Sequence, residues 1–133
     1  VGIAGLGAAL EQHILPDIDR IRATKKRLLR QFWDGLGSIP NVVVYGPQNP
    51  DENAGVVSLN IRGAVCSQVG LALDRAYGIL TRTGLHCAPA AHRTLGTYPQ
   101  GTVRFSLGAF NTEEQIAGVL AALSEIASKV GES

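Results

Sequence analysis

Four short segments rich in β-branched residues alternate with segments of helical period, and their order limits the folds open to this chain. The segments with strand character are residues 42–45, 56–61, 79–83 and 102–107. Longer stretches before, between and after them carry apolar residues at helical spacing. The order helix, strand, strand, helix, strand, strand, helix predicts an α+β fold. We expect a small, mostly antiparallel sheet of about four strands with helices packed on one face.

The expected helices cover residues 1–36 and 65–77 and a last segment that begins after Asn111 or Thr112. Pro16 interrupts the first helix, so a kink or break is expected near Leu15. Thr112 to Gln115 has the spacing of a capping box, which predicts the start of the last helix. Residues 88–100 show no clean period and carry no predicted element.

Length and composition narrow the class of protein. A chain of 133 residues predicts one domain, and a net charge of +1 gives no sign of a nucleic-acid or anionic membrane partner. No apolar run approaches the ~20 residues of a membrane-spanning helix. Cys66 and Cys87 form no CxxC pair or disulfide framework, which favours a reducing, cytoplasmic location. Their spacing with His86 and His92 does not predict a metal site.

Residues 82–89 hold the most reactive group of side chains in the sequence. Arg82, His86 and Cys87 bring a guanidinium, an imidazole and a thiol together where the third strand is expected to end at Gly84. Nearby positive groups lower the pKa of a thiol and favour the nucleophilic thiolate. A buried Cys that only fills core space is the alternative, and the residue pattern alone leaves both open.

Two motifs carry a family resemblance. Residues 78–89 resemble the catalytic-cysteine loop of the cysteine desulfurases, enzymes dependent on pyridoxal phosphate in the class V aminotransferase superfamily. Residues 101–107 and 110–114 are similar to the arginine strand and following helix start of that family. The resemblance implies that the chain, residues 1–133, is the C-terminal small domain of a fold-type I enzyme. Residues 1–36 would be a helical lead-in from an upstream cofactor domain.

The resemblance also implies roles for single residues. Cys87 would be the catalytic sulfur acceptor, attacking the sulfur of L-cysteine to give L-alanine and a persulfide that passes to a sulfur-acceptor protein. Arg104 would bind the substrate α-carboxylate, although an arginine paired with Asp or Glu in an edge strand remains an alternative. Arg82 and His86 would also contact substrate, and His86 could promote thiolate formation or hydrogen-bond the loop. Leu85 departs from the His that many relatives carry there.

The resemblance implies pyridoxal phosphate as the cofactor, but the chain has no suitable lysine for it. The only lysines are Lys25, Lys26 and Lys129, all in expected helices, and no Gly-rich phosphate cradle is present. The cofactor lysine is therefore expected upstream, in an enzyme that is a homodimer when intact and serves iron–sulfur cluster assembly. Two alternatives remain: a selenocysteine lyase or other class V enzyme, and a stand-alone binding or sulfur-carrying domain without catalysis.

Overall fold

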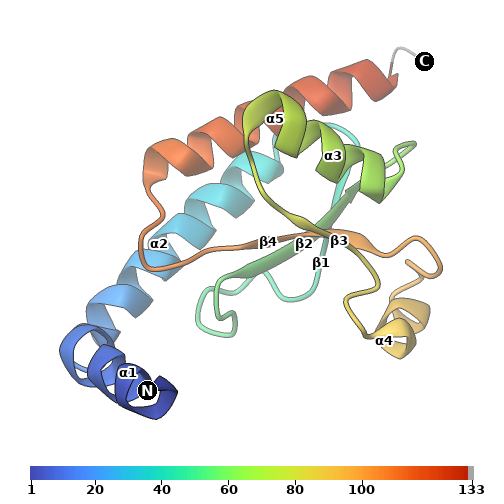
Figure 1. The fold of residues 1–133 in the computed structure, drawn as a ribbon. Helices are drawn as coiled ribbons and strands as arrows, with labels where there is room; N and C mark the ends of the chain where they lie inside the picture. The colour runs from blue at the N-terminus through green and yellow to red at the C-terminus, as the bar shows by residue number, and fades with distance from the viewer. Residues whose placement is uncertain (132–133) are drawn as a thin grey trace.

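A four-stranded antiparallel sheet covered on one face by helices forms the fold of this chain (Figure 1). The structure is a computed structural model, and it describes residues 1–131 apart from the side chain of His13. The strands follow the order β1-β2-β4-β3, with bounds β1 Val42–Tyr45, β2 Val56–Ile61, β3 Arg82–Gly84 and β4 Thr102–Ser106. The predicted α+β class and the predicted antiparallel sheet are confirmed.

Three long helices form the layer above the sheet, and a short helix lies apart from them (Figure 1). The helical elements are α1 Gly2–Ala9, the π-helix η1 Leu10–Ile14, α2 Ile18–Leu36, α3 Cys66–Tyr77, α4 Pro89–Thr94 and α5 Glu113–Gly131. The layer consists of α2, α3 and α5, while α4 follows β3 outside it. Within residues 1–131, no helix combines the length and the apolar character needed to cross a membrane.

The core lies between the sheet and this helical layer because strand residues alternate between the two faces of the sheet. In β2, Val57, Leu59 and Ile61 are buried, and in β4 Val103 and Phe105 are buried. They meet the buried side chains of the helices, which include Leu28, Leu29, Phe32, Leu73 and Leu123. The rings of Phe32 and Phe105 meet edge to face, with centroids 5.3 Å apart. Each fully buried side chain of this size stabilises the fold by about 1.5–3 kcal/mol.

The break expected near Leu15 is confirmed. The amide of Leu15 donates to the carbonyl of Leu10 at 2.8 Å, which closes the π-helical turn, and α2 restarts only at Ile18. Pro16 explains the restart, because it lacks an amide hydrogen and its ring clashes with the preceding turn. On the N-terminal side of the break, α1 has no buried residue.

The third strand is shorter than predicted, and its first residues belong to a helix cap. Ile79 donates its amide to the carbonyl of Leu73 at 2.9 Å, and Gly78 donates to Asp74 at 3.0 Å. Gly78 is left-handed, with φ of 65°. The bond from Gly78 to Asp74, four residues earlier, is the bond of the αL cap motif, which ends α3. Because that cap uses Ile79, β3 begins only at Arg82, and the prediction of a strand over 79–83 is wrong at its start.

The short helix α4 was missed because six residues are too few to show a period. Pro89 occupies the first turn of this helix. That position suits proline, since the first amide hydrogens of a helix have no partner within the helix. His92 lies in α4 and is buried.

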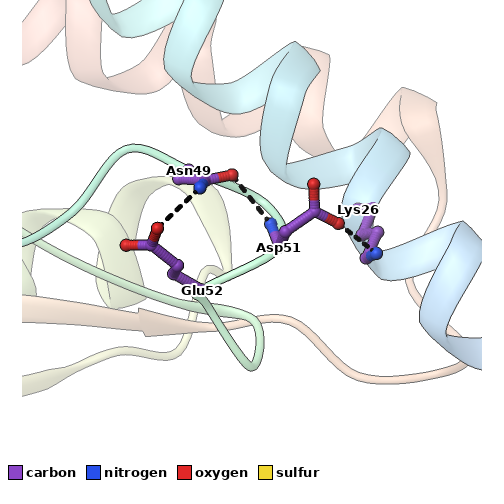
Figure 2. Close-up of polar contacts among 4 residues, drawn as sticks. All are labelled: Lys26, Asn49, Asp51 and Glu52. Carbon is purple, nitrogen blue, oxygen red and sulfur yellow. Dashed lines mark hydrogen bonds and ion pairs between the residues drawn. The ribbon is translucent and has the colours of Figure 1, made fainter.

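The loop between β1 and β2 is tied to α2 by polar contacts (Figure 2). Lys26 pairs with Asp51, and hydrogen bonding to Lys26 holds the pKa of the Asp51 carboxyl below its usual value. The amide of Asp51 donates to Oδ1 of Asn49 at 3.0 Å, and Nδ2 of Asn49 donates to Glu52 at 2.9 Å. These contacts occupy Lys26, so its ammonium is part of a structural ion pair.

Candidate active site

Two arginines lie directly opposite each other on the face of the sheet that the helices leave open. Arg82 of β3 is the antiparallel partner of Arg104 of β4. Arg104 lies between the core residues Val103 and Phe105 in sequence, so strand alternation directs its side chain away from the core. β4 is an interior strand of the sheet, so the alternative of an edge-strand arginine does not hold.

This arginine pair has the electrostatics of an anion site. Like charges directly opposite each other on neighbouring strands are destabilising. Among residues 1–131, no carboxylate forms a salt bridge with Arg82 or Arg104. The Nε atom of Arg104 is buried and has no hydrogen-bond partner in that range. A bound carboxylate would offset the repulsion and accept a bidentate pair of hydrogen bonds from the planar guanidinium.

Cys87 lies in a tight turn that follows β3 directly. The amide of Ala88 donates to the carbonyl of Leu85 at 2.8 Å and closes the turn. Its two central residues are left-handed, His86 with φ of 50° and Cys87 with φ of 61°. Positive φ at both central positions is typical of a type I′ turn, which Gly, Asn and Asp normally occupy. For other residues this backbone costs about 1–2 kcal/mol each.

The turn exposes the thiol of Cys87. Strained backbone conformations of this kind cluster at active sites, where surrounding contacts keep them in place. Cys66 is the opposite case, since it is only 3% exposed and its thiol donates to the carbonyl of Gln100 at 3.1 Å. Cys66 therefore has a structural environment.

His86 connects this turn to β4. Its Nε2 lies 3.3 Å from Oγ1 of Thr102, and its Nδ1 is buried without a partner among the described residues. Burial lowers the pKa of His86, and the positive charges of Arg104, His92 and Arg82 lower it further. The imidazole is therefore mainly neutral near pH 7, and it reaches from the thiol turn to Thr102 on the strand that carries Arg104.

His92 packs against His86 from α4. The two ring centroids are 5.8 Å apart. Nδ1 of His92 lies 2.7 Å from Oγ1 of Thr97, so the ring is held from its other side by a buried hydroxyl. Thr102, which is 1% exposed, has no counterpart in the sequence interpretation. Its position two residues before Arg104, on the same strand face, is the signal that could have identified it.

The four site residues expected from the sequence are thus brought to one corner of the sheet, around β3 and the start of β4. The lysines lie elsewhere: Lys25 and Lys26 are on α2 and Lys129 is on α5. Lys129 pairs with Glu125 at 2.6 Å. In the part of the chain that the structure describes, no group of three or more His, Cys, Asp or Glu side chains is placed to hold a metal ion.

Comparison with known proteins places this geometry in context. Residues 1–119 match the family model for aminotransferase class-V. Cysteine desulfurases from Salmonella agona (strain SL483) and Salmonella typhimurium (strain LT2) are each 33% identical over 130 residues. These matches cover 98% of this chain and 30% of the relative, so the chain spans about 30% of the length of the curated relatives it matches.

Solved structures agree with these sequence matches. The cysteine desulfurase CsdA from Escherichia coli superposes with a TM-score of 0.81 at 25% identity, over 97% of this chain and 30% of that one. The apo cysteine desulfurase from Thermococcus onnurineus NA1 superposes with a TM-score of 0.75 at 33% identity, over 80% of this chain and 26% of that one.

Proposed function

This chain belongs to the aminotransferase class-V family, and on that premise we propose that it acts as the small domain of a cysteine desulfurase. One observation carries the proposal. An exposed thiol lies in a strained turn, and that turn is hydrogen-bonded to the strand of an unpaired arginine. A substrate amino acid with a carboxylate at one end and sulfur at the other fits this pairing of groups.

The residues described here do not fit the covalent attachment of pyridoxal phosphate. The cofactor requires a Schiff-base lysine, and the three lysines lie on α2 and α5, in the helical layer, while the arginine pair lies on the open face. We therefore place the cofactor lysine on a separate domain that precedes residue 1 in the intact enzyme. When bound, the cofactor serves as an electron sink for the substrate.

Arg104 binds the α-carboxylate in this proposal, and Arg82 adds positive charge on the same face. Cys87 acts as the nucleophile, and its thiolate attacks the substrate sulfur. The carbon–sulfur bond of the substrate breaks as the sulfur–sulfur bond of a Cys87 persulfide forms. The carbon that loses sulfur keeps the electron pair and gains a proton, so the product that leaves is alanine. An exposed turn suits a group that must first meet substrate and then a sulfur-acceptor protein. The proposal includes a homodimeric, cytoplasmic enzyme with L-cysteine as its substrate.

The natural full-length protein, supplied with pyridoxal phosphate and L-cysteine, tests the proposal. We expect alanine and a persulfide on Cys87 in equal amounts during the first turnover. Cys87→Ser should abolish both products and leave cofactor absorbance in place, because a hydroxyl supplies no anionic nucleophile near neutral pH. Cys66→Ser is the matched control and should retain both products. Alanine production at the wild-type rate by Cys87→Ser would exclude the thiol acceptor.

Selenocysteine is the alternative substrate, since a selenocysteine lyase would use the same carboxylate site. Competition between L-cysteine and L-selenocysteine in the same assay distinguishes the two. A specificity ratio, measured as kcat/KM, that favours selenocysteine and leaves cysteine unreacted would assign the protein to that class.

A further inference from the structure

His86 is the one described side chain of the thiol turn with a hydrogen-bond contact to a strand of the sheet. Nε2 of His86 meets Oγ1 of Thr102 at 3.3 Å, and that hydroxyl belongs to a residue that is almost fully buried. A buried hydroxyl without a hydrogen-bond partner costs free energy, so the Thr102 hydroxyl favours keeping its contact with His86. The turn is held at the first residue of β4.

Thr102 ties this contact to the arginine site. It lies two residues before Arg104 on β4, so the two side chains share one face of the sheet. On the opposite strand, Gly84 pairs with Thr102 and Arg82 pairs with Arg104. The hydrogen bond between His86 and Thr102 therefore positions the thiol turn relative to the strand that carries the carboxylate-binding guanidinium.

His92 limits the positions that the His86 ring can adopt. It packs 5.8 Å away between ring centroids, and Thr97 holds His92 through a 2.7 Å contact at Nδ1. His86 thus lies between a fixed imidazole on α4 and a fixed hydroxyl on β4. The left-handed backbone of His86 and Cys87 requires such contacts, because strained conformations persist only where the surroundings over-determine them.

We propose that His86 is a positioning residue that sets the distance between the Cys87 thiol and the Arg104 guanidinium through its hydrogen bond to Thr102. This inference rests on the proposed function, because it concerns the reach of one substrate between those two groups. A small displacement of a reacting group lowers the rate of a reaction that depends on near-attack geometry. His86 itself exchanges no proton with substrate in this proposal.

The test uses the natural full-length protein loaded with pyridoxal phosphate and four variants: His86→Asn, His86→Gln, Thr102→Val and the double variant His86→Asn/Thr102→Val. Asn tolerates the left-handed backbone of position 86 but is too short to reach Thr102. The amide of Gln stands near the position of Nε2 and keeps the bond. Thr83→Val is the matched control, since the Thr83 methyl lies against Gly70 of α3, on the other face of the sheet.

The first measurement needs no substrate. Hydrogen exchange of the Ala88 amide, which closes the turn, should be about 3- to 10-fold faster in Thr102→Val, the factor expected from one net hydrogen bond. In His86→Asn the lost bond is partly offset by relief of the left-handed backbone, so its exchange should be faster by a smaller factor. His86→Gln and Thr83→Val should exchange like the wild type. Unchanged exchange in both His86→Asn and Thr102→Val would overturn the proposal, whatever the enzyme's reaction is.

The second measurement is kcat/KM for alanine formation from L-cysteine. Each single loss variant should fall about 3- to 10-fold, and the double variant should fall no further than the worse single variant, because both changes remove one interaction. Losses that multiply in the double variant, or a His86→Gln variant as impaired as His86→Asn, would overturn the positioning role. If the variants exchange faster but the wild-type protein makes no alanine, the structural role of the His86–Thr102 contact would be supported. The assignment as a cysteine desulfurase would be contradicted.

Discussion

Gly84 and Gly101 lie back to back where β3 ends and β4 begins, so closely that a Cβ on Gly101 would sit 2.2 Å from the carbonyl carbon and oxygen of Gly84. Both residues are left-handed, with φ of 103° and 83°. The carbonyl of Gly101 accepts a hydrogen bond from Nδ2 of Asn60 at 2.9 Å, which fixes this approach from β2. The missing Cβ of Gly101 lets the thiol turn start directly beside β4, whereas a Cβ added to Gly84 would meet nothing within 4 Å.

The glycine contact predicts a large stability loss for Gly101→Ala. A left-handed alanine alone costs about 1–2 kcal/mol, and here the added methyl also overlaps backbone atoms that cannot rotate away. We expect the free energy of unfolding to fall by more than about 2 kcal/mol. Urea denaturation of the 133-residue chain, followed through the fluorescence of Trp33, gives the value. Trp33 is the single tryptophan and is only 9% exposed.

Gly96→Ala is the matched control for this variant. Gly96 is also left-handed, with φ of 71°, but nothing lies within 4 Å of a Cβ added there. The free energy of unfolding of Gly96→Ala should fall by only about 1–2 kcal/mol, the cost of a left-handed backbone at an alanine. Equal losses in the two variants would show that the overlap with Gly84 carries no cost.

The two cysteines should differ sharply in reactivity. Cys87 is exposed on its turn, whereas Cys66 is buried at the start of α3 and hydrogen-bonded to Gln100. Iodoacetamide can reach Cys66 only after a local opening, and an opening free energy of about 1.4 kcal/mol already slows a reaction tenfold. We expect Cys87 to be alkylated more than about tenfold faster, measured by peptide mass spectrometry over time. Faster labelling of Cys66 would contradict the burial described here.

Arg104 should determine substrate use in the intact enzyme. Loss of a charge-assisted bidentate pair in Arg104→Ala should lower kcat/KM for L-cysteine by about 30- to 1000-fold, or about 2–4 kcal/mol. Arg104→Lys restores the charge but not the planar fork, so it should recover only part of the loss. Arg75→Ala, an exposed position in the last turn of α3, is the control. A loss below about threefold in Arg104→Ala would return Arg104 to a structural role.

The sequence was sufficient for the main features of the fold because the long helices and most of the strands have a clear residue pattern. The β-branched segments 56–61 and 102–107 predicted β2 and β4, and Pro16 predicted the break before α2. The limits of β3 were not predictable, because the backbone hydrogen bonds that tie Gly78 and Ile79 to the end of α3 leave no mark in the side-chain pattern. The helix α4 was missed for the related reason that a single short helical segment has no measurable period.

For the site, the residue types could be predicted but their mutual arrangement could not. Cys87, His86 and Arg82 are near neighbours in sequence, so their grouping follows from the loop itself. The pairing of Arg82 with Arg104 depends on strand register, which the hydrophobic pattern of a three-residue strand does not determine. Thr102 was missed because a threonine in a strand is usually interpreted as a β-former.

The shifted titration of His86 predicts how stability depends on pH. Burial and the positive charges of Arg104, His92 and Arg82 lower its pKa in the folded state, whereas the unfolded value is about 6.5. Between these two values the unfolded chain binds more protons than the folded chain, so stability increases with pH in that window. The contribution is fully present above about pH 6.5 and is lost as pH falls below that value toward the lowered folded pKa.

His86→Gln removes this titration while keeping a polar side chain at the same position. The free energy of unfolding of wild-type chain, followed through Trp33, should fall more steeply between pH 7.5 and about pH 5.5 than that of the variant. Comparing slopes cancels the titrating groups remote from this turn, because both proteins contain them. Any change at His92, which packs against His86, is part of the difference measured. Absolute stabilities can differ without affecting the test. Equal slopes would mean that His86 titrates in the folded chain as it does in the unfolded one, and the buried, cation-flanked imidazole described here would be wrong.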